Sequence, residues 1–238
     1  TPEAVERVIR PVAEHFPRAT VVEMENTHNR CGGTIWPLEQ MQAVATLARS
    51  RGIAVHLDGA RLWNAHVATG VALTAYAATA DSVSVCFSKG LGAPVGSALA
   101  GTGDFVEEAR GNRRRYGGAM RQAGIIAAGA LYALEHNLER LAEDHEKAAV
   151  LAGYLEQVPG MELVHPVQTN ILIASVGGLG VGAEQVVAAL WEAGVLCGVA
   201  AVDRVRFVTH LDVTMEAVKA AGEIVVRALS GLGRTVAT

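Results

Sequence analysis

At 238 residues and 50% hydrophobic content, the chain is long enough to bury the core of one large domain or one and a half. Its net charge of −4 and sequence pI of about 6.1 provide no electrostatic basis for binding nucleic acid. No apolar stretch reaches the roughly 20 residues that a membrane-spanning helix needs, and no signal peptide is visible. Three scattered cysteines suit neither a disulfide framework nor a zinc site, so we expect a cytoplasmic protein without a bound metal.

The first half of the chain alternates between strand-like and helix-like segments. Thr1, Pro2 and Glu3 are typical of a helix start, whereas Gly52 and Gly70 are typical of helix ends. The expected helices cover residues 1–10, 38–52, 60–70 and 104–115, and the expected strands cover residues 19–26, 53–58, 83–87 and 96–101. This alternation predicts part of a larger parallel sheet in an α/β fold.

The second half begins with an apolar region at 120–158 that contains one long helix or two. Beyond it we expect a small α/β lobe with strands over 161–166, 169–176 and 204–211, and helices over 183–194 and 214–229. The sequence therefore predicts two domains, covering residues 1–147 and 148–238.

Two segments suggest a shared ligand crevice. Each segment contains an apolar strand that leads into a polar or glycine-rich loop. In the first, IAVHLDGA, the strand ends on Asp58, and HLDGAR at 56–61 includes this end; in the second, DSVSVCFSKG, it leads to Lys89. Groups at the carboxyl ends of strands line the crevice of an open α/β sheet. Asp58, Arg61 and Lys89 would thus supply a carboxylate, a guanidinium and an amine. This set suits pyridoxal 5′-phosphate (PLP), which forms a Schiff base with a lysine and has a protonated ring nitrogen.

The chain contains only three lysines, at positions 89, 147 and 219. Lys147 and Lys219 lie on predicted helices, whereas Lys89 lies between an apolar strand and a glycine turn. Burial there would lower the pKa of the amine and make it nucleophilic. The structural alternative is a surface lysine at the end of a strand.

Five motifs in order along the chain resemble the L-threonine aldolase family, a branch of the fold type I PLP-dependent enzymes, whose fold is that of aspartate aminotransferase. They are MENTHNRCGG at 24–33, HLDGAR at 56–61, FSKGLGAPVGS at 87–97, GGAMRQAG at 117–124 and RFVTHLD at 206–212. The resemblance implies that residues 1–147 form the C-terminal part of the large PLP-binding domain, and residues 148–238 the small domain.

The resemblance also implies roles for five residues. Lys89 resembles the family's Schiff-base lysine, and Asp58 the carboxylate that pairs with the pyridine nitrogen. Arg61 resembles the arginine near the ring and the substrate carboxylate, and Arg206 the arginine that clamps that carboxylate. His15 resembles a histidine that handles the substrate β-hydroxyl. Without the family, Arg206 would be interpreted as a strand arginine in a surface ion pair, and His15 as a loop histidine without a role.

The family carries a further N-terminal part, with a Gly-Thr phosphate cup and a histidine stacked on the PLP ring. Neither motif occurs in this chain, and we see no convincing helix N-terminus for a phosphate in the right context. We therefore expect a C-terminal fragment or an incomplete gene product.

The implied reaction is retro-aldol cleavage of threonine or allo-threonine to glycine and acetaldehyde. The alternatives are another PLP-dependent reaction, such as β-elimination or racemisation, or an inactive truncated fragment that folds alone or with a partner. A nucleotide-binding domain, with Asp58 on a ribose or magnesium, lacks the glycine fingerprint. The resemblance also implies a small-molecule amino-acid substrate and a homo-oligomer, either a dimer or a tetramer, with neither nucleic acid nor membrane as a partner.

Overall fold

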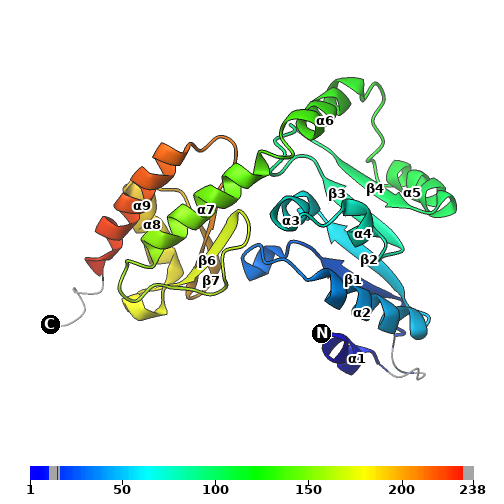
Figure 1. Cartoon of the computed structure of the whole chain (residues 1–238), viewed down its shortest axis with the longest axis horizontal. Helices are drawn as coiled ribbons and strands as arrows, with labels where there is room; N and C mark the ends of the chain where they lie inside the picture. The colour runs from blue at the N-terminus through cyan, green and yellow to red at the C-terminus, as the bar shows by residue number, and fades with distance from the viewer. Residues whose placement is uncertain (11–14, 16, 233–238) are drawn as a thin grey trace. The chain divides into compact units, whose positions relative to one another are not determined.

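The computed structural model describes residues 1–10, 15 and 17–232. The chain forms two compact units (Figure 1). The first contains residues 1–27 and 36–138, and the second contains residues 28–35 and 139–238. The expected domain boundary after residue 147 stays a prediction, although the chain passes from one unit to the other between Leu138 and Glu139. None of the helices in the described part of the chain is long and apolar enough to cross a membrane.

The first unit contains a four-stranded sheet and several helices, some of which pack against its strands. Its strands are β1 (Val21–Glu25), β2 (Ala54–Gly59), β3 (Ser82–Cys86) and β4 (Ser97–Gly101), hydrogen-bonded in that order. Its helices are α1 (Pro2–Val8), α2 (Leu38–Ser50), α3 (Leu62–Thr69), α4 (Leu73–Ala77), α5 (Gly103–Arg115) and α6 (Gly124–His136). The strands β1, β2 and β3 are parallel, as expected, but β4 runs antiparallel to β3.

The core of the first unit lies between its parallel strands and α2. Met24 of β1 and Leu57 of β2 are fully buried, as are Met41, Val44 and Ala48 along one face of α2. The strand residues follow the two-residue period of a sheet, and the helix residues the spacing of an amphipathic helix. This packing holds the carboxyl ends of β1, β2 and β3 at one edge of the sheet.

The second unit is a four-stranded antiparallel sheet covered by three helices. The strands are β5 (Glu162–Leu163), β6 (Ile171–Ser175), β8 (Arg204–Val208) and β7 (Gly198–Ala201), in that spatial order. The helices α7 (Leu141–Leu155), α8 (Ala183–Glu192) and α9 (Met215–Leu229) share one apolar core with β6 and β8. The unit also contains two short 3-10 turns, η1 (Asn29–Cys31) and η2 (Gly177–Leu179).

The apolar region at 120–158 forms two helices, α6 and α7, which is one of the two arrangements expected, and the chain turns between them. Other sequence predictions need correction. The strand expected over 161–166 has only the two residues of β5, because this edge strand pairs only with β6 and then meets Pro166, which lacks an N–H donor. The helix α4 and the edge strand β7 were not predicted, because both are short and lack a clear period.

Candidate functional site

Asp58 lies in β2, at the edge of the first unit's sheet where the carboxyl ends of the parallel strands meet. Its register partners are Glu25 of β1 and Ser84 of β3, so two parallel neighbours surround it. The side chain is half-buried, and its Oδ1 accepts a hydrogen bond from the Ala60 N–H at 2.9 Å. A carboxylate so held has its orientation set by the backbone of the following turn.

Arg61 immediately precedes helix α3 and is half-buried. Gly59 allows the close approach needed between the end of β2 and this helix, because a Cβ there would lie 2.8 Å from the Ser84 carbonyl oxygen and 3.1 Å from Leu62. The HLDGAR motif therefore joins a buried strand to a helix by a tight turn, and it places Asp58 and Arg61 near the same strand end.

Lys89 follows β3, the strand next to β2. Its carbonyl oxygen accepts a hydrogen bond from the Gly92 N–H at 2.8 Å, which closes a turn. Leu91 is the buried residue of this turn, at 1% exposure, whereas Lys89 is exposed. The burial that we expected for Lys89 is thus absent in this chain, because the turn directs Leu91 rather than Lys89 into the core.

The structure therefore places Asp58, Arg61 and Lys89 at the ends of two adjacent parallel strands of one unit. His15 also belongs to the first unit, where it is exposed between α1 and β1, and residues 11–14 and 16 beside it lie outside the described part of the chain. Arg206 lies in the second unit.

Arg206 lies in the middle of β8, between Ile173 of β6 and Gly198 of β7. It is half-buried, and its Nε atom is buried without a hydrogen-bond partner. Desolvation by burial lowers the pKa of this guanidinium. A half-buried cation with an unsatisfied donor is suited to bind an anion.

Asn26, which the sequence interpretation left without a role, shapes the loop after β1. It is fully buried, and its backbone N–H donates to the Asp58 carbonyl oxygen at 3.0 Å. Its side chain accepts from the Trp36 N–H at 3.2 Å and donates to the Trp36 carbonyl at 3.3 Å. Its position in MENTHN, directly after a strand, was the available signal.

A second carboxylate–amine pair lies in the second unit. Lys147 Nζ is 3.1 Å from Asp144 Oδ1, and the two side chains are only 7% and 0% exposed. This pair lies on α7 and is covered by the end of β8, where the Thr209 hydroxyl donates to the Asp144 carbonyl at 2.6 Å. Lys147 is therefore a structural lysine in a buried ion pair.

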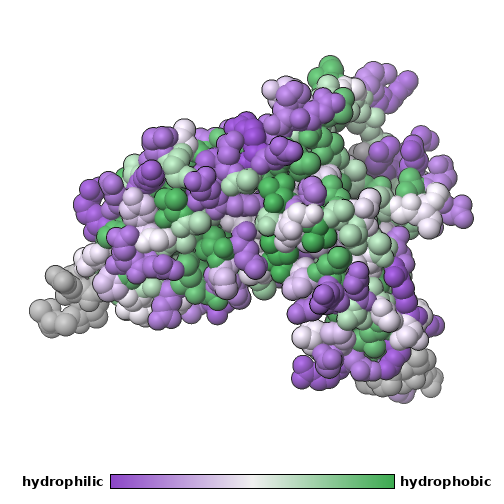
Figure 2. Space-filling model, in the orientation of Figure 1, coloured by the Kyte–Doolittle hydropathy of each residue, from purple (hydrophilic) through white to green (hydrophobic). Residues whose placement is uncertain are grey.

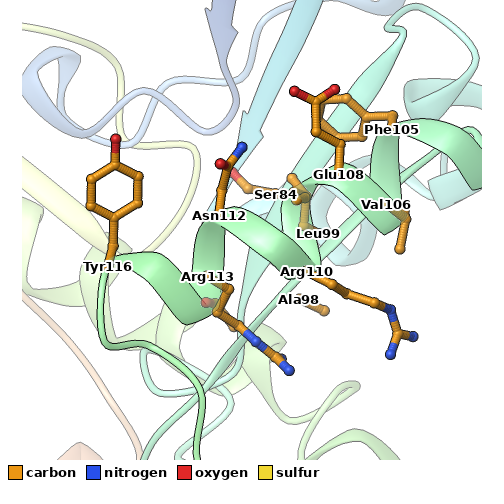
Figure 3. A pocket seen from close by; sticks show the side chains of 12 residues that line it. Ser84, Ala98, Leu99, Phe105, Val106, Glu108, Arg110, Asn112, Arg113 and Tyr116 are labelled. Atoms are coloured by element: carbon orange, nitrogen blue, oxygen red, sulfur yellow. The ribbon is translucent and has the colours of Figure 1, made fainter.

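A cavity of about 830 Å³ lies between β4 and α5. Its lining combines apolar residues such as Leu99 and Phe105 with Arg110 and Arg113, whose side chains extend on the same side of α5 (Figure 3). None of the described residues that line it is a predicted site residue. Within the described part of the chain, no group of three or more His, Cys, Asp or Glu side chains could hold a metal ion.

Comparison with known proteins identifies the chain's relatives. Residues 1–177 match the family model described as beta-eliminating lyase. The chain belongs to the beta-eliminating lyase family. It is 42% identical to the low specificity L-threonine aldolase of Escherichia coli strain K12, over 87% of this chain and 60% of the relative. It is 40% identical to low-specificity L-threonine aldolase 1 of Arabidopsis thaliana, over 89% of this chain and 60% of the relative. The family resemblance inferred from the motifs is confirmed.

Solved structures that resemble this chain confirm the fold. Leishmania major threonine aldolase superimposes with a TM-score of 0.80 at 19% identity, over 96% of this chain and 67% of that one. A Thermus thermophilus aspartate aminotransferase mutant gives a TM-score of 0.72 at 17% identity, over 96% and 63%. The chain has the fold type I, aspartate aminotransferase-like architecture that was predicted. It spans about 60% of the length of the curated relatives described above.

Proposed function

We propose that this protein is a PLP-dependent lyase that cleaves threonine or allo-threonine, and related β-hydroxy-α-amino acids, to glycine and an aldehyde. The observation that carries the proposal is the placement of Asp58 and Lys89 at the ends of adjacent parallel strands, in a chain whose relatives are named L-threonine aldolases. An amine and a carboxylate at one sheet edge match the two groups that PLP requires of its protein.

Asp58 and Lys89 fit the ring nitrogen and the aldehyde of the cofactor. The Asp58 carboxylate is half-buried and oriented by the Ala60 N–H, which suits it to hold a protonated pyridine nitrogen. The Lys89 amine would hold the aldehyde carbon. When bound, PLP supplies an electron sink for the negative charge that develops at the substrate Cα.

The remaining site residues would act on the substrate. Arg206 would bind the α-carboxylate, and its unsatisfied buried Nε supports that role. Arg61 would act near the cofactor ring and the substrate carboxylate, as its place in the family motif implies. His15, directly or through a water molecule, would accept the β-hydroxyl proton as the Cα–Cβ bond breaks and the C–O bond becomes a carbonyl. A proton returned to Cα completes glycine.

We also propose that the protein is a cytoplasmic homo-oligomer, either a dimer or a tetramer. The first unit exposes several large apolar side chains. They include Val95, Leu99, Phe105, Met120 and Ile125. Apolar side chains are visible at the surface around α6 in Figure 2. Exposed apolar groups of this size favour association with another protein surface.

Reductive trapping tests the cofactor assignment. The purified protein is mixed with PLP, reduced with borohydride and digested, and the modified lysine is located by mass spectrometry. We expect modification at Lys89, suppressed by excess threonine and absent in Lys89→Arg. Lys147 is shielded in its ion pair, and the exposed Lys219 gives the level of unselective labelling. Labelling of Lys89 no greater than that of Lys219 would contradict the proposal.

The bond that is broken needs a separate assay, because β-elimination and racemisation use the same cofactor. Incubation with threonine should release acetaldehyde and glycine in equal amounts. Release of ammonia with a keto acid, or recovery of the other enantiomer, would replace the aldolase assignment by one of these reactions.

A further inference from the structure

We propose that Trp63 and Asn137 are positioning residues for Lys89, acting through the backbone of its loop. This inference rests on the proposed function, since it assumes that Lys89 is the reactive amine. The two side chains lie far apart in the sequence, on α3 and just after α6, and each donates a hydrogen bond to a backbone carbonyl on one side of Lys89.

Trp63 anchors the chain before Lys89. Its indole Nε1–H donates to the carbonyl oxygen of Cys86, the last residue of β3, at 2.9 Å. Its ring stacks on Phe87, with ring centroids 6.1 Å apart and planes inclined by 26°. Trp63 is also two residues beyond Arg61 in sequence, so α3 connects the Asp58–Arg61 turn directly to the start of the lysine loop.

Asn137 anchors the chain after Lys89. Its Nδ2 donates to the Leu91 carbonyl oxygen at 2.8 Å. Leu91 is only 1% exposed, so water cannot readily replace this donor. The Leu91 carbonyl lies inside the turn closed by Lys89 and Gly92, so Asn137 sets the orientation of a peptide within that turn.

Helix α6 and the residue that follows it contact the loop that carries Lys89 through one face of the helix. Gly129, Ala133 and Asn137 follow at intervals of four residues and share a face. A Cβ at Gly129 would lie 2.9 Å from Pro94 Cδ, and Ala133 is 1% exposed. By contrast, Ile125, Leu131 and Tyr132 on the rest of this helix are exposed. The packing of α6 within its unit is thus directed at the loop that carries Lys89.

The loop has further internal bonds. Phe87 N–H donates to the Gly96 carbonyl at 3.0 Å, and Ala93 N–H donates to the Phe87 carbonyl at 3.1 Å. Lys89 is therefore an exposed, long side chain on a backbone restrained at both ends. An amine on a restrained backbone can occupy only a limited set of positions. An error of about 1 Å in such placement can reduce a rate about a hundredfold.

The test uses two substitutions that remove one donor each. Trp63→Phe keeps an aromatic ring but removes the indole N–H, and Asn137→Asp replaces the amide donor by an acceptor of the same shape. Trp191→Phe is the matched control, because Trp191 is 65% exposed on α8. Two quantities are measured: the ratio of Lys89 to Lys219 modified by PLP and borohydride, and amide hydrogen exchange throughout the chain.

We expect each donor variant to reduce the labelling ratio and to speed exchange at the Gly92 and Ala93 amides, each by roughly tenfold, as expected for one lost hydrogen bond to a shielded carbonyl. The control should match the wild type. Unchanged exchange in the loop, or faster exchange spread evenly over the first unit, would overturn the positioning role. If the wild type itself shows no preference for Lys89, the proposed function fails, and loop exchange alone then decides whether the two side chains restrain the loop.

Discussion

Asp144 is a fully buried carboxylate that forms an ion pair with Lys147. Its Oδ1 is 3.1 Å from Lys147 Nζ, while Oδ2 is buried without a hydrogen-bond partner. Desolvation raises the pKa of Asp144, and Lys147 opposes that rise through a hydrogen bond and its charge. A buried pair of this kind contributes little net stability, but removing one partner leaves an uncompensated charge.

Lys147→Met should therefore lower the free energy of unfolding by about 3–5 kcal/mol. The double variant Asp144→Asn with Lys147→Met should recover more than half of that loss, because it removes the stranded charge. Urea unfolding followed by circular dichroism measures both. Lys219→Met, at an exposed site on α9, is the control and should stay within about 0.5 kcal/mol of the wild type. A loss of similar size in the single and double variants would show that the charge is not the cause.

The sequence indicated which lysine precedes a glycine turn, but it could not indicate which lysine is buried. Local pattern showed Lys147 in a charged helical segment, whereas its burial depends on Thr209 and the end of β8, more than sixty residues later. Lys89 follows an apolar strand, yet the turn geometry buries Leu91 instead. Charge and neighbours can be predicted locally; burial depends on contacts distant in sequence.

At the scale of elements, α7 and α9 pack closely where a glycine faces an aromatic ring. A Cβ at Gly222 of α9 would lie 2.3 Å from Cγ of Tyr154 on α7, and 2.9 Å from its Cβ. These atoms are near the backbone of α7 and cannot move aside without shifting the helix. Gly153, one residue before Tyr154, has nothing within 4 Å of the same position.

The two glycines predict opposite effects of an added methyl group. Gly153→Ala should stabilise the protein by about 0.5–1 kcal/mol, through better helix propensity alone. Gly222→Ala gains the same propensity but must displace Tyr154, so we expect a net loss of about 1–3 kcal/mol. Thermal unfolding of the two variants in parallel measures the difference. Equal shifts of the same sign would contradict the close packing.

Helices and strands were largely predictable from the sequence where the hydrophobic period is strong and the residues that cap the helix ends are typical. The Thr214 side chain accepts from the Ala217 N–H at 3.1 Å at the start of α9, and Gly70 ends α3 with a φ of 71°, as their residue types suggest. No sequence signal distinguishes Gly153 from Gly222, since both lie in helix interiors and differ only in what faces them.

At the scale of the whole molecule, the order of strands and helices gave the correct fold class, but one segment departs from that order. Residues 28–35 lie between β1 and α2 in sequence and yet belong to the second unit. Thr169 donates to the Gly33 carbonyl at 2.6 Å, and Ile35 N–H donates to Gln168 at 2.8 Å. These bonds join residues more than 130 positions apart, which periodicity cannot reveal.

Only part of the candidate site could be predicted from the sequence. Asp58 and Lys89 could be assigned to one edge of the sheet from sequence, because Asp58 lies near the end of β2, Lys89 follows β3, and these parallel strands are neighbours. The hydrogen bonds of Trp63 and Asn137 to the backbone on either side of Lys89 could not be predicted, because an indole or amide donor finds its carbonyl only through the packing of α3 and α6.

Global stability should depend on pH through His145 of α7. Burial lowers the pKa of this histidine from 6.5 to about 4, so the folded chain binds fewer protons there than the unfolded chain. Above pH 6.5 this histidine does not lower the free energy of unfolding. As the pH falls from 6.5 towards 4, it lowers that free energy by at most about 3 kcal/mol. Asp144 acts in the opposite sense, because its raised pKa favours the folded state as the pH falls towards its ordinary value of 3.8.

A difference measurement isolates the histidine from the aspartate. The free energy of unfolding is measured in urea between pH 4 and pH 8 for the wild type, His145→Gln and the control His136→Gln, which alters an exposed histidine of α6. Between pH 6.5 and 4, His145→Gln should lose less stability than the wild type, since glutamine takes up no proton on unfolding. The control should retain the wild-type slope. Parallel curves for all three proteins would mean that His145 is protonated equally in the folded and unfolded chain, and that its burial has no energetic effect.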